Sequence, residues 1–426
     1  MRRMKRAVKL HYGEKWVEIE LPEKQILAIV YPKKIHGVPD EIAEIERSLD
    51  NPIGHKGLSA LSRKGKNTVI ICDDYTRPTP TDKILPILLN RLNDVGISDE
   101  NIKILIAAGT HRYMSVDEIK RKVGKEVMKR IEVMNHYWKD EKMLVGLGKT
   151  PLGTPISVNK HVIDADIKIG VGNIIPHCVG GWGGGAKIIQ PGVCGAETTD
   201  YTHWLSAKFF IKDLLGIAEN PIRIEIEEIA RKVGLDFIIN TVLNSQMEIV
   251  RVVSGDFVEA HREGVKVARQ VYGVEVPAKA KIVVCDSYPC DVDLWQAIKA
   301  IYAAELVVEK GGTIVLITPC WEGVSSEHPT WLDYGFRPYD EIKKLVEAGK
   351  ITDLIASADL AIIGRMINEK AKVILCSAGI SEAETQKLNF DYAKTPQEAI
   401  NKVFIAYSPK DKIVVLRGAA ELLPII

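Results

Sequence analysis

Long hydrophobic runs are missing from this sequence of 426 residues. Its apolar stretches, such as 67–72 and 103–108, are short and interrupted by charge. None approaches the roughly 20 apolar residues that a membrane-spanning helix needs. The basic start, Met1–Arg6, is followed by neither an apolar core nor a small-residue cleavage site. We therefore expect no secretory signal and no membrane partner.

An excess of one charge sign is also missing. Lys and Arg total 57, Asp and Glu total 56, and the formal net charge is +1. Proteins that bind nucleic acid usually show a basic excess or stripe, so we expect no nucleic-acid partner. With 46% hydrophobic residues, the chain can bury sizeable cores, and its length allows two or three domains.

Cysteine is scarce and irregularly placed. No C-x-x-C pair occurs, which argues against zinc-ribbon and iron–sulfur sites. A chain of this length does not depend on disulfides, so we expect reduced thiols and a cytoplasmic location. The seven cysteines are Cys72, Cys178, Cys194, Cys285, Cys290, Cys320 and Cys376.

Short apolar runs alternate with amphipathic segments along most of the chain. Residues 8–21 alternate in polarity around Tyr12-Gly13-Glu14-Lys15, a pattern typical of a β-hairpin. Buried strands are expected at 68–72, 102–107, 167–171, 238–242, 281–285, 313–317, 360–363 and 372–376. Helices are expected at 81–95, 116–123, 220–233, 256–272 and 340–348. This alternation predicts an α/β fold with largely parallel sheets flanked by helices.

A domain boundary is predicted near residues 274–279, because Gly273 and Pro277 follow the expected helix 256–272. We predict an N-terminal α/β domain, residues 1–274, and a C-terminal α/β domain, residues 275–426. The cleft between two such domains is the expected place for the active site.

The expected strand 68–72 runs into the loop DDYTRPTP, residues 73–80. Arg77 in this loop presents a planar fork that suits a carboxylate or phosphate. Asp74 can accept a hydrogen bond from a substrate hydroxyl or orient a neighbouring side chain. In an alternative interpretation, the aspartate only caps the helix that begins near Thr81. After the strand 102–107, His111 stands in a second loop, where an imidazole can act as acid or base near neutral pH.

A third loop region begins at His177, soon after the expected strand 167–171, and continues as GGWGGGAK at 180–187. The glycines can expose backbone N–H groups to an anion, but they are equally typical of a flexible loop. The pattern is neither a Walker A loop nor a G-x-G-x-x-G turn. Lys187 at the end of the run, followed by His203, favours a bound phosphorylated ligand.

In the C-terminal half, Gln296 and Lys299 are three residues apart in an expected helix and so share one of its faces. Alone they would be ordinary surface residues. Taken together, however, the motifs between residues 70 and 300 resemble, in order and spacing, those of the nickel-pincer-nucleotide-dependent lactate racemases and related 2-hydroxyacid racemases and epimerases.

The resemblance implies a role for each matching residue. Lys187 would carry the cofactor covalently, a pyridinium-3-thioamide-5-thiocarboxylic acid mononucleotide that holds Ni(II). His203 would be the protein ligand of the nickel ion, in a roughly planar site. The remaining matches concern the substrate: His111 and His177 would be the catalytic acid/bases, Arg77 would hold the carboxylate with Asp74 nearby, and Gln296 and Lys299 would assist.

The implied reaction inverts C2 of a lactate-like 2-hydroxy acid by proton-coupled hydride transfer through a 2-keto acid. Partners would be the small substrate and the proteins that make and load the cofactor. The oligomeric state stays open, and a homo-oligomer is one of the states allowed. Trp295 departs from the family pattern, in which we expect tyrosine, so we hypothesise that it lines the substrate pocket.

Three alternatives compete with lactate racemisation. With the same cofactor, the substrate could be malate or a longer aldonic acid. A non-catalytic nucleotide-binding protein is disfavoured because two histidines and an Asp–Arg pair exceed what binding needs. A dehydrogenase with dissociable NAD is disfavoured because no G-x-G-x-x-G turn is followed by an acidic residue.

Overall fold

The computed structural model describes residues 4–62 and 66–426. The chain forms two compact units. We call one the N-terminal unit, which comprises Lys34–Thr202 and Gly216–Val271. The other, the C-terminal unit, comprises the described residues up to Lys33, His203–Leu215 and Tyr272–Ile426.

The N-terminal unit is built on a six-stranded sheet in the order β13-β12-β9-β4-β5-β6. Strand β13 runs antiparallel to β12, and the other neighbouring pairs are parallel. Strands β4, β9 and β12 are buried along their whole length, as expected for continuous apolar runs in a parallel sheet. The bounds are β4 (Thr68–Asp73), β5 (Ile102–Ala107), β6 (Glu132–Asn135), β9 (Ile167–Asn173), β12 (Phe237–Leu243) and β13 (Ile249–Gly255).

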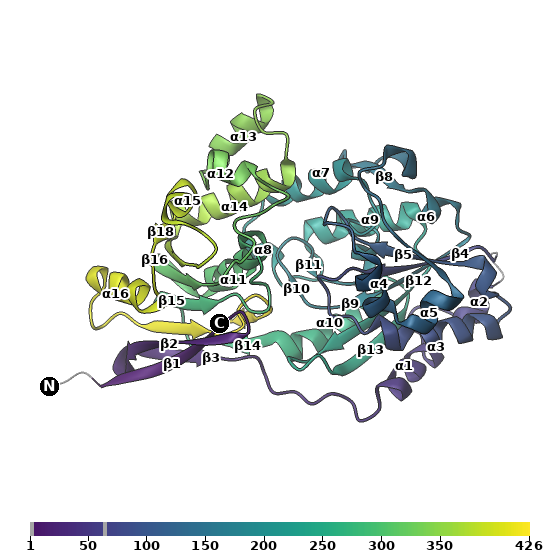
Figure 1. Cartoon of the computed structure of the whole chain (residues 1–426), viewed down its shortest axis with the longest axis horizontal. Coiled ribbons are helices and arrows are strands. Elements are labelled where there is room, and N and C mark those ends of the chain that lie inside the picture. The colour runs from purple at the N-terminus through teal and green to yellow at the C-terminus, as the bar shows by residue number, and fades with distance from the viewer. Residues whose placement is uncertain (1–3, 63–65) are drawn as a thin grey trace. The chain divides into compact units, whose positions relative to one another are not determined.

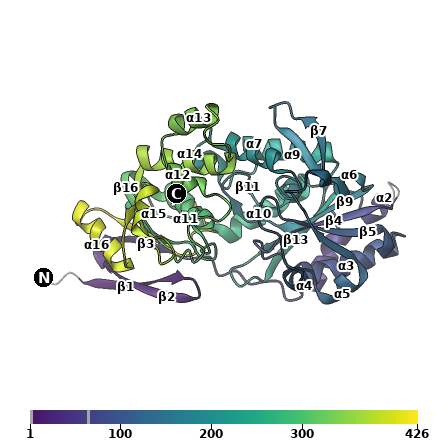
Figure 2. The same cartoon turned by 45° about the horizontal axis from the view of Figure 1, so that its top comes forward.

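Helices cover both faces of this sheet. The apolar sides of α1, α3, α4 and α5 form one core with the strands. Figures 1 and 2 show α6 and α9 on the opposite side of the sheet from α3 and α5. A capping box between Ser115 and Glu118 begins α4, and Gly234 in the left-handed conformation ends α9. The bounds are α1 (Glu41–Asp50), α2 (Leu58–Leu61), α3 (Thr81–Asp94), α4 (Val116–Val123), α5 (Lys125–Arg130), α6 (Lys160–Asp164), α9 (Pro221–Val233) and α10 (Glu259–Tyr272).

Two short antiparallel pairs complete the N-terminal unit: β7 (Leu144–Lys149) with β8 (Pro155–Asn159), and β10 (Pro176–His177) with β11 (Gly181–Trp182). Helix α7 (Ala196–Ser206) begins in the N-terminal unit, and its residues from His203 onward belong to the C-terminal unit.

The C-terminal unit has a second six-stranded sheet, in the order β18-β17-β16-β15-β19-β3, and its neighbouring strands are parallel. The strands are β3 (Ile26–Val30), β15 (Ala280–Asp286), β16 (Val308–Ile317), β17 (Ala371–Cys376), β18 (Asp391–Tyr392) and β19 (Ile413–Leu416). The helices are α8 (Ile211–Leu214), α11 (Leu294–Val307), α12 (Thr330–Tyr334), α13 (Tyr339–Glu347), α14 (Leu354–Glu369), α15 (Glu382–Lys387) and α16 (Pro396–Ala406). A parallel pair joins β14 (Gly273–Glu275) to β20 (Leu423–Ile425). The expected α/β class with parallel sheets is confirmed.

Two details differ from the expectation. The single division at residue 274 is incomplete, because residues 4–33 pack with the C-terminal unit. There β3 pairs with β19, and the hairpin of β1 (Lys5–Tyr12) and β2 (Lys15–Pro22) contributes to the apolar core of the second sheet. The strand expected at 360–363 is wrong. This apolar run lies within α14, a helix that is buried along much of its length, and periodicity does not separate such a helix from a buried strand.

No helix in the described residues is long and apolar enough to cross a membrane. All seven cysteines lie in the described part of the chain, and none of them is in a disulfide there.

Candidate active site

The loops that carry Asp74, His111 and His177 leave one edge of the N-terminal sheet. Strand β4 lies between β5 and β9 and pairs in parallel with both. The carboxyl ends of these three neighbouring strands therefore lie at the same edge of the sheet. Open α/β sheets bind their ligands at this edge. The sheet order thus brings together the three loops that the sequence singled out.

Asp74 and His111 form a carboxylate–imidazole pair. Asp74 Oδ2 lies 2.7 Å from His111 Nδ1, and Asp74 is only 2% exposed. Its Oδ1 accepts hydrogen bonds from the amide and the hydroxyl of Thr76, at 3.0 and 2.5 Å. Burial alone would raise the pKa of Asp74, but the contacts with His111, Thr76 and Arg77 lower it overall. The ionised carboxylate accepts Nδ1–H of His111, so Nε2 is the basic nitrogen of this imidazole.

The alternative interpretation, in which the aspartate caps the next helix, is wrong. Helix α3 begins at Thr81 after Pro80, and no side chain caps it. Asp73 instead accepts a hydrogen bond from the hydroxyl of Thr79 and forms a buried ion pair with Lys122, at 2.8 Å. These aspartates therefore order the loop itself rather than the helix.

Arg77 is half-buried, and its backbone is fixed by a second cation. Lys122 Nζ donates to the carbonyl of Arg77 at 2.7 Å. The Arg77 side chain donates from Nη1 to the carbonyl and hydroxyl oxygens of Thr76, both at 3.0 Å. These bonds engage one of its three guanidinium nitrogens. The guanidinium therefore stands beside the Asp74–His111 pair, with a fork suited to a carboxylate.

His177 has a different environment from His111. It ends β10, and its Nδ1 accepts hydrogen bonds from the amides of Val179 and Gly180, at 3.1 and 3.2 Å. A nitrogen that accepts two N–H groups carries no proton, so the neutral ring has its proton on Nε2. His111 thus offers a basic Nε2 in this structure, whereas His177 offers an Nε2–H donor.

The glycine-rich segment is tightly packed, and its glycines are needed for space. A Cβ atom on Gly181 would lie 2.0 Å from the carbonyl oxygen of Ile217. One on Gly184 would lie 2.6 Å from Asn240 Oδ1, and both glycines have positive φ angles, +72° and +70°. L side chains avoid these angles. The segment therefore is not the flexible loop that glycine content alone allows.

A buried arginine holds the carbonyls of this segment. Arg223 of α9 is fully buried and donates from Nε to the oxygen of Gly180 at 3.0 Å and from Nη1 to that of Gly184 at 3.2 Å. It also donates to the carbonyl of Trp182. His261 Nε2 lies 2.9 Å from the carbonyl of Gly183. Burial lowers the pKa of Arg223 to about 9, which still leaves the guanidinium charged at neutral pH.

Several amides of the segment are also occupied by the protein. Gly185 N–H donates to Asn240 Oδ1 at 2.7 Å, and Gly183 N–H donates to the carbonyl of Ile175 at 2.7 Å. These two N–H groups already have partners, which weakens the expected anion-binding nest at this point.

Lys187 lies in the 3-10 turn Gly185–Ile188, which packs on β4 and β9. Gly170 in β9 makes room for the turn, since a Cβ atom there would be 2.6 Å from the Ile188 side chain. On its other side the lysine passes Gly180, where a Cβ atom would lie 3.1 Å from Lys187 Cδ. Because Gly180 also donates to His177, the lysine and this histidine contact the same residue.

The Lys187 turn is tied to the His111 loop as well. Gly192 N–H donates to the carbonyl of Lys187 at 3.3 Å, and Gly109 N–H donates to the carbonyl of Gly192 at 2.9 Å. The predicted lysine tether and both predicted catalytic histidines are therefore in one region of the N-terminal unit.

Four predicted residues belong to the C-terminal unit: His203, Trp295, Gln296 and Lys299. His203 is half-buried in the last turn of α7. In α11 the Lys299 Nζ donates to Gln296 Oε1 at 2.5 Å, so these two residues share a helix face as expected. The expectation that they line a cleft together with the N-terminal residues stays a prediction.

Trp295 is held by buried groups of the C-terminal unit. Its ring contacts His328 edge-on, with centroids 4.4 Å apart. The carboxylate of Asp359 accepts hydrogen bonds from Trp295 and, at 2.8 Å, from the hydroxyl of Tyr302. The indole N–H therefore points to a protein carboxylate. Burial raises the pKa of Asp359 to about 6, and the hydrogen bonds oppose this rise.

Four residues that were not predicted from the sequence hold the loops of the site through hydrogen bonds: Lys122, Arg223, Asn240 and His261. A signal existed for one of them. Arg223 and Glu227 are four residues apart on a helix whose apolar positions include Ile226 and Ala230. The helical period therefore puts these two charged residues on the buried side of the helix, which indicates that they have a specific role.

Comparisons with known proteins agree with this architecture. Residues 12–209 match the family model described as the lactate racemase N-terminal domain, and residues 274–422 match the lactate racemase C-terminal domain. The lactate racemase of Thermoanaerobacterium thermosaccharolyticum is 30% identical over 398 residues, covering 91% of this chain and 90% of the relative. The lactate racemase of Lactiplantibacillus plantarum is 29% identical and covers 96% and 97% of the two chains.

A solved structure is similar over the whole chain. The lactate racemase apoprotein of T. thermosaccharolyticum superposes with a TM-score of 0.89 at 27% identity, covering 99% of this chain and all of that one. A Thermotoga maritima protein shares the fold with a TM-score of 0.71 at 23% identity, covering 92% and 99%. These matches confirm the resemblance seen in the sequence, and with it an enzyme of the isomerase class. The chain belongs to the lactate racemase family.

Proposed function

We propose that this protein inverts C2 of a small 2-hydroxy acid, with lactate as the leading substrate, by means of a nickel-pincer nucleotide attached to Lys187. Family membership supports the racemase activity. The single observation that carries the proposal is the Asp74–His111 pair at 2.7 Å, whose loop is tied through Gly192 to the turn of Lys187.

The residues present fit such a cofactor. Lys187 follows a tightly packed glycine-rich segment, in which a Cβ atom on Gly181 or Gly184 would collide with neighbouring atoms at 2.0 or 2.6 Å. The described residues contain no group of three or more His, Cys, Asp or Glu side chains that would hold a metal by themselves. A single histidine, His203, would suffice as the protein ligand if an organic cofactor supplied the other donors of the nickel ion. When bound, this cofactor supplies the hydride-accepting carbon.

The residues of the chain provide binding and proton transfer. Arg77 anchors the substrate carboxylate so that the planar 2-keto acid does not leave before it is reduced. His111 Nε2 accepts the hydroxyl proton while the C2 hydrogen leaves, and the Asp74 carboxylate stabilises the imidazolium that forms. Return of the hydrogen to the other face of the ketone gives the opposite enantiomer.

His177 serves the other face of the substrate. With Nδ1 accepting from the amides of Val179 and Gly180, its Nε2–H is the group that would donate a hydrogen bond to the substrate oxygen. To carry a second proton it must release the amides of Val179 and Gly180 from Nδ1, since that nitrogen cannot then accept. The two histidines are therefore unequal in the groups that they offer to the substrate.

Trp295 bears on the identity of the substrate. Its N–H is engaged by Asp359, so it presents ring surface rather than a hydroxyl to whatever lies beside it. We propose that it shapes the substrate pocket. Malate and aldonic acids remain the alternative substrates, and a panel of stereochemical exchange assays distinguishes them from lactate.

The test is to produce the chain together with the proteins that synthesise the cofactor, which we propose as its loading partners in a reducing cytoplasm. Intact mass, nickel content and racemisation are then measured for the parent, Lys187→Ala and the exposed-lysine control Lys160→Ala. We expect the control to match the parent and Lys187→Ala to lose adduct and activity with an unchanged circular dichroism spectrum. Full activity in Lys187→Ala would refute the proposal.

A further inference from the structure

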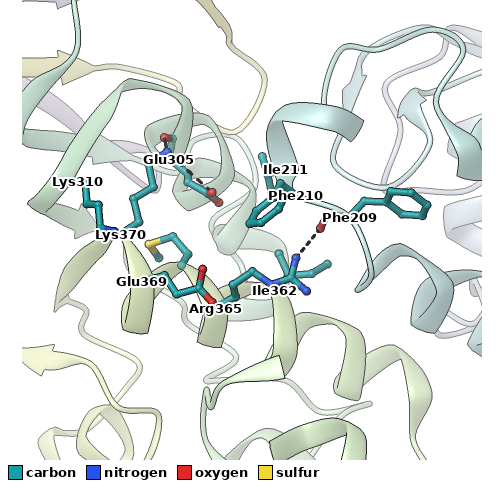
Figure 3. Close-up of a pocket in the computed structure, with 10 residues that line it drawn as sticks. Phe209, Phe210, Ile211, Glu305, Lys310, Ile362, Arg365, Glu369 and Lys370 are labelled. Carbon is teal, nitrogen blue, oxygen red and sulfur yellow. Dashed lines mark hydrogen bonds and ion pairs between the residues drawn. The ribbon is translucent and has the colours of Figure 1, made fainter. Parts of the chain in front are cut away.

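The chain that follows His203 is fastened by one arginine of the C-terminal unit. Helix α7 ends at Ser206, and the next residues form a tight turn with Phe209 N–H bonded to the carbonyl of Ser206. Arg365 of α14 donates from Nη2 to the oxygen of Ala207 at 2.6 Å and from Nη1 to that of Phe209 at 3.1 Å. Figure 3 shows Arg365 reaching the carbonyl of Phe209. The guanidinium thus satisfies two carbonyls of the turn that follows the helix, and a cation near a helix C-terminus is favourable.

Two aromatic rings lie close to the same guanidinium. Its central carbon lies 4.9 Å from the ring centroid of Phe210 and 5.0 Å from that of Tyr339. Tyr339 in turn stacks on Trp204, with centroids 5.9 Å apart and planes inclined by 17°. Trp204 is the residue directly after His203. Arg365 therefore contacts the segment after the helix and, through one ring, the helical turn that carries His203.

Arg365 projects from a helix that is largely buried. Helix α14 has 16 residues and buries Leu360, Ile363 and Met366 around the arginine position. Arginine suits this role better than lysine, because a planar fork binds two carbonyls and stacks on rings at once.

We propose that Arg365 is a positioning residue for His203, which fixes the imidazole in the orientation that the nickel ion requires. The inference rests on the proposed function, in which His203 is the nickel ligand. Partners that hydrogen-bond to a metal ligand commonly change metal affinity by ~10–100-fold when removed. We take the lower end of this range for Arg365, which acts on the helical turn of His203 instead. Loss of Arg365 frees the carbonyls of Ala207 and Phe209, lets the last turn of α7 fray and loosens the hold on Trp204.

The cavity beside Arg365 supplies a matched control. It has a volume of about 250 Å³, and its walls include Lys310 and Lys370 as well as Phe210 and Ile362. Lys310 is exposed, and Figure 3 shows it on the same cavity as Arg365. Lys310→Met removes a cation from this wall and leaves the bonds of Arg365 in place.

The experiment compares the cofactor-loaded parent with Arg365→Met, Arg365→Lys, Lys310→Met and His203→Ala. Intact mass gives the fraction of chains with the Lys187 adduct. Nickel release into excess chelator is then timed per adduct-bearing chain. We expect Arg365→Met to keep the adduct and release nickel at least ~10-fold faster than the parent. Arg365→Lys should be intermediate, and Lys310→Met should match the parent.

The outcomes separate the two ideas. If His203→Ala holds nickel as the parent does, the ligand assignment fails, and the inference fails with it. If His203→Ala loses nickel while Arg365→Met releases it at the parental rate, only the positioning role is refuted. Loss of the adduct in Arg365→Met also refutes it, because the effect would then not be on the nickel ligand. Should Arg365→Met not fold, Tyr339→Leu tests the same support and should also accelerate release.

Discussion

Replacing Asp74 by asparagine should trap His111 in the wrong tautomer. In the native loop Thr76 donates two hydrogen bonds to Oδ1 of Asp74, and Oδ2 faces His111 Nδ1. The same Thr76 donors will hold the carbonyl oxygen of the new amide side chain at the Oδ1 position. The amide NH₂ then faces Nδ1 and donates to it. His111 Nδ1 becomes an acceptor, its proton moves to Nε2, and the base that should receive the substrate proton is lost.

The size of the effect follows from what is removed. General acid–base catalysis by a positioned side chain contributes ~10²–10⁴-fold to the rate. At about 1.36 kcal/mol for each factor of ten, this is about 2.7–5.4 kcal/mol of activation free energy. A hydrogen bond to a charged group, worth about 1.5–3 kcal/mol, is lost as well. Because Arg77 still holds the carboxylate, we expect kcat to fall by at least ~10² with little change in KM.

The fall in kcat is measured from initial rates in both directions, with the two enantiomers separated by chiral chromatography. The variant protein must match the parent in adduct and nickel content. Asp82→Asn, an exposed substitution in the first turn of α3, serves as the control and should leave the rates unchanged. The reasoning is refuted if loaded Asp74→Asn keeps more than about a tenth of the parental kcat, since a base without its tautomer cannot supply that rate.

Three further predictions concern stability and specificity. Gly184→Ala combines a φ of +70° with a collision at 2.6 Å, whereas the control Gly96→Ala has a φ of +88° and nothing within 4 Å. Gly184→Ala should therefore lower Tm more than Gly96→Ala does and should reduce adduct formation. Equal losses of Tm in the two variants would contradict the collision. Burial raises the pKa of Asp359 from an unfolded value near 3.9 to about 6. The folded state therefore binds the Asp359 proton more tightly than the unfolded state does. This contribution to the free energy of unfolding is fully present below pH ~4, and roughly 3 kcal/mol of it is lost as pH rises through ~6. Asp359→Asn should flatten the Tm profile over that range, and an unchanged slope would exclude this residue. Trp295→Tyr should alter preference among lactate, malate and aldonates more than cofactor loading, and identical kinetics over the panel would exclude a pocket role.

Local sequence was sufficient for much of the fold. The strands at β4, β5 and β9 were predictable because buried parallel strands are short apolar runs that end in polar loops. Helix α4 was predictable to the residue, since its capping box and its charge pattern are local. The helical state of the apolar run 360–363 was not predictable, because a short apolar run fits a buried helix and a buried strand equally well.

The sequence by itself determined the chemical groups available: an Asp–Arg loop, two histidines after strands, a glycine-rich segment and Lys187. Tertiary structure decided how they are used. Sheet order placed β4 between β5 and β9, and so joined Asp74 to His111 across 37 residues. The packing of helices α9 and α14 brought Arg223 to the glycine-rich segment and Arg365 to the end of α7. Such contacts depend on packing between distant segments, and a hydrogen bond between them leaves no pattern in the local sequence.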